Sequence, residues 1–164
     1  MSEESLRLLA DGMLGRLAKW LRLLGYDTAY DNAATDPELA HQARAENRVL
    51  LTRDRELSAR RGLRTLLIES EVLEEQVHEV QNALGPPPHP SLSRCAVCNA
   101  ALEPVSPEEV ADRVPPYVRR NQSDFQRCPG CGRVYWPGTH LQTMHDLMQK
   151  FGTKKPNDRK SDDA

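Results

Sequence analysis

Short apolar runs alternate with amphipathic segments through the first half of the chain. In the first amphipathic segment, apolar side chains recur from Leu14 to Leu24 at the i, i+3, i+4 and i+7 spacing of one helix face, and Gly25 then stops the helix. The pattern predicts strands at 6–10, 26–30, 48–52 and 64–68 and helices at 13–24, 36–46, 54–61 and 71–84. Because strands and helices alternate with short loops, we expect an α/β fold with a parallel sheet flanked by helices.

The four cysteines all lie in the second half, in two Cys-x-x-Cys pairs. Each pair can present two thiolates to one tetrahedral ion, and in a reducing compartment this arrangement favours structural zinc over disulfides or a redox pair. The predicted zinc ligands are Cys95, Cys98, Cys128 and Cys131.

Residues next to the cysteines agree with this interpretation. Asn99 and Gly132 directly follow the second cysteine of each pair, where a zinc knuckle adopts the left-handed backbone that Asn and Gly tolerate best. The segment between the pairs is longer than a minimal zinc ribbon needs, and we expect a helical insert near 108–113. His140 and His145 could replace a cysteine in principle, but four cysteines already complete the tetrahedron.

A proline-rich segment at 85–91 separates the two patterns, because proline cannot continue a helix or join a central strand. Residues 1–90 carry 11 basic and 15 acidic side chains, whereas 91–164 carry 11 basic and 9 acidic ones. We predict an α/β domain at 1–84, a semi-rigid linker at 85–91, a zinc ribbon with a C-terminal helix at 92–151 and a disordered tail at 152–164.

Overall composition limits the classes of function. The 164 residues carry a net charge of −2, which excludes a protein that holds nucleic acid by bulk positive charge. Any such contact must therefore use a local patch. The sequence shows neither a signal-peptide pattern nor an apolar run of membrane-spanning length, so we expect a cytoplasmic protein with no membrane contact.

Three aspartates follow the predicted strands. Asp11 ends the first strand, Asp54 ends the third, and Asp36 opens the helix after the second. Ligands of such sheets gather at the carboxyl ends of the strands, and carboxylates that share an edge suit Mg²⁺ or Mn²⁺. The alternative is that each acid acts alone, with Asp36 and Asp54 as helix N-caps and Asp11 opening a turn with Gly12.

Basic residues surround this predicted edge. Arg16, Lys19 and Arg22 recur every three residues along the first helix, and Arg53 and Arg55 flank Asp54. Cations beside metal-bound carboxylates suit phosphodiester cleavage, because they hold the neighbouring phosphates. A solvated helix face is the alternative for each charge taken singly. Trp20 is interpreted as a core or groove-wall residue in preference to a platform on which bases stack.

Four segments together resemble one family. They are DGMLGRLAKWLRLLGYD at 11–27, LLTRDREL at 50–57, RCAVCN at 94–99 and VYWPGTH at 134–140. They are similar to the Mut-seven C-terminal RNase domain family, whose members join a PIN-like nuclease domain to a zinc ribbon, and the similarity extends from about residue 6 to about 148.

The resemblance implies a metal-dependent ribonuclease with Asp11, Asp36 and Asp54 as its acidic set. Related nucleases commonly present four acids, and Glu56 and Glu38 are the candidates for the fourth. Whether one or two metal ions bind stays open.

Three functions compete at this point. The first is a ribonuclease that acts on single-stranded or structured RNA, with a possible protein partner at the zinc ribbon. The second is a catalytically inactive zinc-ribbon adaptor for RNA or the ribosome. A receiver-like signalling domain is disfavoured, because such a domain needs a lysine late in the sheet and none occurs between Trp20 and Gln149.

Overall fold

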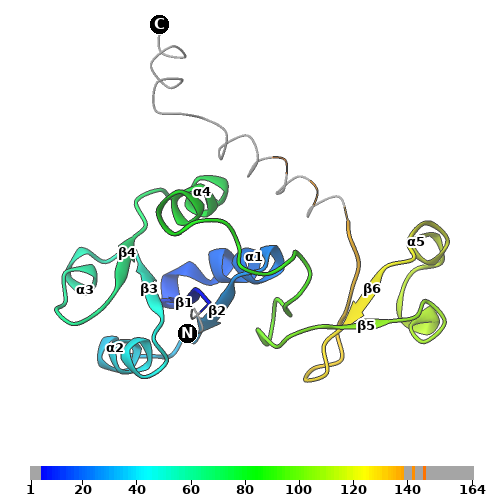
Figure 1. Ribbon diagram of the computed structural model, residues 1–164, viewed down its shortest axis with the longest axis horizontal. Helices are drawn as coiled ribbons and strands as arrows, with labels where there is room; N and C mark the ends of the chain where they lie inside the picture. Colours follow the sequence, from blue (N-terminus) through cyan, green and yellow to red (C-terminus); the bar gives the residue numbers. More distant parts are fainter. Residues whose placement is uncertain (1–4, 139–141, 143–145, 147–164) are drawn as a thin grey trace, which may run out of the picture.

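The computed structural model describes residues 5–138 together with 142 and 146. Its first part is a parallel sheet of strand order β2-β1-β3-β4, with helices on both faces (Figure 1). The strands are β1 (Arg7–Ala10), β2 (Asp27–Tyr30), β3 (Val49–Thr52) and β4 (Thr65–Leu67). The helices are η1 (Gly12–Leu14), α1 (Gly15–Leu24), α2 (Asp36–Ala45), α3 (Arg55–Ser58) and α4 (Leu73–Leu84). The predicted fold class and element order are therefore confirmed.

The core lies on both faces of the sheet, as the continuous apolar strands require. Successive strand residues point to opposite faces. Leu8 therefore packs in the cluster that contains the apolar face of α1 and α4, whereas Leu9 packs with residues of α2 and α3. Strand β3 divides in the same way, with Leu51 on the first face and Leu50 on the second.

The second part is a small antiparallel sheet of order β5-β6-β7. Its strands are β5 (Glu103–Val105), β6 (Phe125–Arg127) and β7 (Val134–Tyr135). The insert expected near 108–113 is a 3₁₀ helix, η2 (Ala111–Arg113), and a further helix α5 (Pro116–Asn121) follows it. Val110, Val114, Val118 and Phe125 form the core of this part.

The segment predicted as a linker packs against the C-terminal end of α1. It contains neither helix nor strand. Tyr26 Oη donates a hydrogen bond to the Gly85 carbonyl at 2.6 Å, and Leu92 N donates to the Leu23 carbonyl at 2.9 Å. Gly25 has φ 111°, and a Cβ there would lie 2.0 Å from the His89 carbonyl oxygen. Only glycine allows both this backbone and the close approach.

Some predictions concern positions that the structure does not describe. The predicted C-terminal helix beyond residue 138, apart from 142 and 146, the predicted disordered tail, His140 and His145 lie outside the described residues. Within the described part, no helix has the length and apolar composition needed to cross a membrane.

Candidate functional site

Asp11 lies at the carboxyl edge of the parallel sheet with its side chain only 6% exposed. Its backbone N donates to the Leu51 carbonyl, which continues the pairing of β1 with β3 by one residue. Asp11 Oδ1 accepts a hydrogen bond from Met13 N at 3.0 Å and so caps η1. A buried carboxylate held in this way is oriented before any ligand arrives.

Thr52 connects Asp11 to Asp54. The fully buried Thr52 hydroxyl donates to Asp11 Oδ2 and accepts a hydrogen bond from Asp54 N at 3.0 Å. Asp54 itself is exposed, and its Oδ1 accepts hydrogen bonds from Glu56 N and Leu57 N at the start of α3. The structure thus links the Asp11 carboxylate through Thr52 to the backbone amide of Asp54, whereas the Asp54 carboxylate itself caps α3.

Asp36 occupies a different position from the one expected. The N-cap of α2 is Thr35, whose Oγ1 accepts from Glu38 N at 3.3 Å, so the expectation that Asp36 caps the helix is wrong. Asp36 is the exposed first helical residue, and no described hydrogen bond joins it to Asp11 or Asp54. Glu38 is engaged in this capping box through its Oε1, whereas Glu56 is exposed on α3.

Two further acids lie at the same edge and were not singled out from the sequence. Asp31 directly follows β2, whose last residue Tyr30 pairs with Ala10 immediately before Asp11. Glu69 follows Ile68, which extends the pairing of β4 with β3 through a 2.7 Å hydrogen bond to the Thr52 carbonyl. An acid therefore follows each of the four strands of the parallel sheet within two residues. Among the described residues, these carboxylates do not form a group of three with ligand atoms within 4.8 Å of one another.

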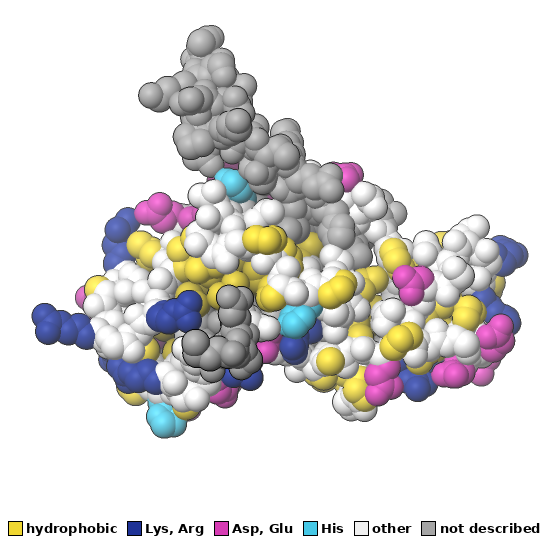
Figure 2. Space-filling view, in the orientation of Figure 1, with side chains coloured by type: hydrophobic (Ala, Val, Ile, Leu, Met, Phe, Trp, Pro, Cys, Tyr) yellow, Lys and Arg dark blue, Asp and Glu magenta, His cyan; other side chains and the backbone are white. Residues whose placement is uncertain are grey.

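The predicted basic residues have unequal surroundings. Arg16 and Lys19 are exposed on α1. Arg53 Nη1 donates to the Ser70 carbonyl at 2.6 Å, so this guanidinium ties the end of β3 to the segment after β4. Arg55 is exposed and lies 4.0 Å from Glu69. On the face drawn in Figure 2, acidic, basic and hydrophobic side chains of the described residues are intermixed, without one large basic surface.

Arg22 does not belong to an exposed basic stripe, which corrects the prediction from the sequence. It is 7% exposed. Its Nε donates to the Thr28 carbonyl at 2.7 Å, and its Nη1 donates to the carbonyls of Ala96 at 2.8 Å and Val97 at 3.2 Å. The guanidinium therefore joins α1 and β2 to the loop between Cys95 and Cys98. Its Nε and Nη1 therefore donate to backbone carbonyls within the fold.

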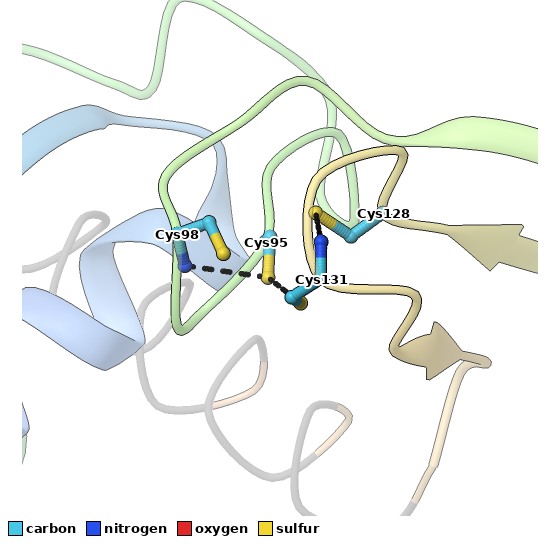
Figure 3. Close-up of side chains that lie close together, drawn as sticks. All are labelled: Cys95, Cys98, Cys128 and Cys131. Carbon is cyan, nitrogen blue, oxygen red and sulfur yellow. Dashed lines mark hydrogen bonds between the residues drawn. The ribbon is translucent and has the colours of Figure 1, made fainter.

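The four predicted metal ligands converge, with ligand atoms all within 4.8 Å of one another (Figure 3). Cys95 and Cys128 are buried, and Cys98 and Cys131 are exposed. The sulfurs of Cys95 and Cys131 lie 3.7 Å apart. That separation excludes a disulfide and fits a tetrahedral zinc ion, for which bonds of 2.3 Å place the sulfurs about 3.8 Å apart.

The two cysteine loops have the same backbone design. Asn99 N donates to the Cys95 carbonyl and Gly132 N donates to the Cys128 carbonyl, each at 2.9 Å. Both residues have the left-handed backbone expected from the sequence, with φ of 64° and 80°. Backbone amides of each loop also point at the sulfur of the first cysteine, at 3.3 to 3.4 Å. Such donors stabilise a thiolate.

The electrostatics of this cluster fit a bound cation. Burial raises the pKa of the Cys95 thiol, but the hydroxyl of Tyr135 at 3.2 Å and the backbone amides outweigh burial and bring the pKa to about 7. The hydrogen bond with Cys131, followed by burial and the charge of the neighbouring thiols, raises the pKa of Cys98 to about 12. A cation among the sulfurs is needed before all four can be thiolates together.

The first cysteine loop also docks on the sheet through Asp27. This carboxylate is 8% exposed and accepts from Asn99 Nδ2 at 2.7 Å and from Arg48 Nη1 at 2.9 Å. Arg7 and Arg94 each lie 3.7 Å away. Burial alone would raise the pKa of Asp27, but the hydrogen bonds from Asn99 and Arg48 outweigh it and hold the pKa below its usual value. No local pattern in the sequence reveals this contact, because its partners are far apart in the chain.

Comparison with known proteins places the chain in a family. No curated protein and no solved structure matches it significantly. The family model described as Mut7-C RNAse domain matches residues 6–148, which include the acidic edge of the sheet and all four cysteines. The chain belongs to the Mut7-C RNAse domain family.

Proposed function

We propose that this protein is a metal-dependent ribonuclease that hydrolyses RNA phosphodiester bonds at the carboxyl edge of its parallel sheet. The observation that carries the proposal is the buried carboxylate of Asp11, joined through Thr52 to Asp54, in a chain of an RNase-domain family. Asp11 and Asp54 are the first residues to which we assign a metal, and Asp36 is the third candidate. Asp31 and Glu69 share the same edge and are better placed than Glu38, which caps α2.

The donor set at this edge consists of carboxylate oxygens, which suits Mg²⁺ or Mn²⁺. Such an ion would polarise the phosphate and lower the pKa of a bound water. The protein's own groups do the positioning. Thr52 fixes the orientation of Asp11, and the exposed Arg16 lies on the first turn of α1, where it can pair with a phosphate. Arg55 and the partly engaged Arg53 offer further positive charge beside Asp54.

The test is a cleavage assay with the zinc-loaded full chain and labelled single-stranded, hairpin and transfer RNA, with added Mg²⁺, Mn²⁺ or Ca²⁺. Asp11→Asn and Asp54→Asn should each lower the rate at least about 100-fold, the size of loss seen when one transition-state contact is removed. Asp112→Asn, an exposed acid of the second part, is the matched control and should leave the rate unchanged.

The same cleavage assay tests whether Asp36, Asp31 and Glu69 belong to the proposed metal site. A loss with Asp36→Asn equal to that of Asp11→Asn would assign Asp36 to the metal site, and an unchanged rate would remove it. Asp31→Asn and Glu69→Gln are read in the same way. If the wild-type chain binds RNA but cuts none with any of these metals, the nuclease proposal fails and the adaptor function stands in its place.

We also propose that the four cysteines hold one structural zinc ion, which the 3.7 Å sulfur separation and the amide donors support. Metal analysis of the purified chain should give close to one zinc per chain. Reactivity of the four thiols should rise sharply when a strong chelator removes the metal. A folded chain without zinc and with freely reactive thiols would contradict the assignment.

A further inference from the structure

An open groove of about 680 Å³ lies between α1 and the second part of the molecule. Its walls come from segments far apart in the sequence: Lys19 and Trp20 on α1, Arg113 on η2, and Arg133 and Trp136 beside β7. Apolar side chains, including Leu23 and Val97, complete the lining. The volume is within the range of ligand-binding clefts.

The charge of this groove has one sign. Lys19, Arg113 and Arg133 are all exposed, and among the described residues none of their three side chains forms an ion pair or a hydrogen bond. No acidic side chain is found among the described residues that line the groove. Three uncompensated cations from three separate elements are unusual on a chain of net charge −2 and indicate an anionic ligand.

Aromatic rings lie beside these cations. Trp20 and Trp136 are half-buried and line the groove together with the positive side chains. Trp136 packs in a T-shaped arrangement on Phe125, with ring centroids 6.1 Å apart, which fixes the orientation of its indole. A positive groove with fixed aromatic rings is the arrangement that single-stranded nucleic acid uses, because bases stack on the rings while the cations follow the phosphates.

We propose that this groove binds single-stranded RNA and holds it for the acidic edge of the sheet. The proposal deepens the ribonuclease function proposed above by assigning a substrate grip. Helix α1 connects the acidic edge with the groove. Arg16 lies on its first turn, close in sequence to Asp11. Lys19 and Trp20 lie one turn further along the helix. From Asp11 to Lys19, η1 and α1 rise by about 12 Å, or about four nucleotides of a stacked strand.

The tryptophans offer a direct assay, because Trp20 and Trp136 are the two tryptophans of the chain. Titrating the zinc-loaded protein with hexauridylate in the absence of Mg²⁺ and Mn²⁺ should quench the intrinsic fluorescence at the same concentrations at which a labelled oligonucleotide gains anisotropy. Trp20→Leu should weaken binding about 5- to 150-fold, the effect of losing one stacked base. Binding without any change in tryptophan fluorescence would overturn the proposal.

The cations are tested by salt dependence. The double variant Arg113→Gln with Arg133→Gln should weaken binding and lower the salt slope by about 1.4, because each released phosphate contact contributes about 0.7. The matched control is Arg119→Gln with Arg120→Gln on α5, which removes the same charge from exposed positions outside the groove lining. An equal effect of the two pairs would mean diffuse attraction and overturn the groove assignment.

Two further results distinguish RNA from an acidic protein segment as the ligand of the groove, and the groove proposal from the ribonuclease proposal. If a polyglutamate peptide quenches the tryptophans and hexauridylate does not, the groove binds an acidic protein segment and the RNA proposal is wrong. If hexauridylate quenches the tryptophans but the wild-type chain cuts no RNA with added metal, the groove proposal stands and the ribonuclease proposal fails. Retained quenching in Asp11→Asn, with cleavage lost, would support both.

Discussion

Replacing Arg22 by methionine tests whether this residue belongs to the protein's fold or to its RNA-binding surface. The side chain is buried and donates hydrogen bonds to the carbonyls of Thr28, Ala96 and Val97. Methionine keeps much of the apolar stem and removes every donor. The variant therefore leaves three backbone carbonyls at the contact between the sheet domain and the first cysteine loop without their partner.

The expected loss can be worked out from these contacts. The two shorter bonds, of 2.7 and 2.8 Å, come from a charged donor, and such bonds contribute about 1.5–3 kcal/mol each. The bond of 3.2 Å shares Nη1 with one of them and adds little. Burial of the guanidinium, which lowers the pKa of Arg22, offsets part of the gain. We expect the free energy of unfolding to fall by about 3–4 kcal/mol.

Denaturant unfolding of the zinc-loaded chain, followed by circular dichroism, measures this loss. Arg16→Met is the matched control, because it makes the same change at an exposed position of the same helix and should shift stability by no more than about 0.5 kcal/mol. Zinc transfer to a chromophoric chelator should be faster in Arg22→Met, since the positive charge near Cys95 and Cys98 favours their thiolates. Unchanged stability and zinc retention, together with weaker RNA binding, would refute the structural role and restore Arg22 to the phosphate-binding set.

Three other predictions concern the contact between the two parts of the molecule and the cluster of four cysteines. Both Gly25 and Gly62 have positive φ, so the backbone cost of alanine is common to the two positions. Only the Gly25 Cβ would meet the His89 carbonyl oxygen, at 2.0 Å, so Gly25→Ala should destabilise the chain by about 1–3 kcal/mol more than Gly62→Ala in the same unfolding assay. Equal losses would mean that the linker moves away freely. The pKa of Asp27 is lowered from 3.8, so the stabilisation it gives is present above pH 3.8 and is lost as the pH falls through its folded value. Asp27→Asn should therefore be less stable than the wild type near pH 6, and the difference should shrink below about pH 4; a constant difference would contradict the sign. Cys131 occupies an exposed position among the predicted zinc ligands, and Cys131→Ser should lower the affinity for zinc. It should also loosen the contacts of Asn99 and Arg22 with the sheet domain, which would be measured as faster amide hydrogen exchange in β2. Faster exchange in the second part alone would show that the two parts are independent.

Local patterns made much of this fold predictable. The strands and long helices follow from apolar periodicity, and Asn99 and Gly132 follow from the backbone of a cysteine loop. The acidic edge of the sheet is predictable beyond Asp11 and Asp54, since Asp31 and Glu69 directly follow predicted strands just as Asp11 does. The N-cap of α2 was misplaced by one residue because Thr35 and Asp36 are both good caps. Only the capping box of Thr35 with Glu38 distinguishes them.

The burial of Arg22 shows that a three-residue spacing along a helix does not place every member of the series on one exposed face. A step of three residues turns a helix by about 300°, so each step falls back by about 60° and Arg22 lies about 120° around α1 from Arg16. That rotation carries Arg22 to the side where Thr28 and the cysteine loop lie, whereas Lys19 stays exposed. The burial depends on a loop more than 70 residues away in the chain, which no local pattern reveals. The groove could not be predicted from the sequence for the same reason, because Trp20 and Trp136 line one groove only in the folded chain.

Helix α1 connects every part of the proposed mechanism. It follows the acidic edge through η1, and because β1 and β2 are parallel it must run back toward the amino end of the sheet, where Asp27 receives Asn99. One face of α1 therefore lines the groove with Lys19 and Trp20 while Arg22 on another side fixes the cysteine loop. In the proposed mechanism, a metal ion held by the four cysteines would order this loop and so set the distance between the groove and Asp11. The second part of the molecule would then serve the proposed cleavage by positioning RNA, without supplying a catalytic group.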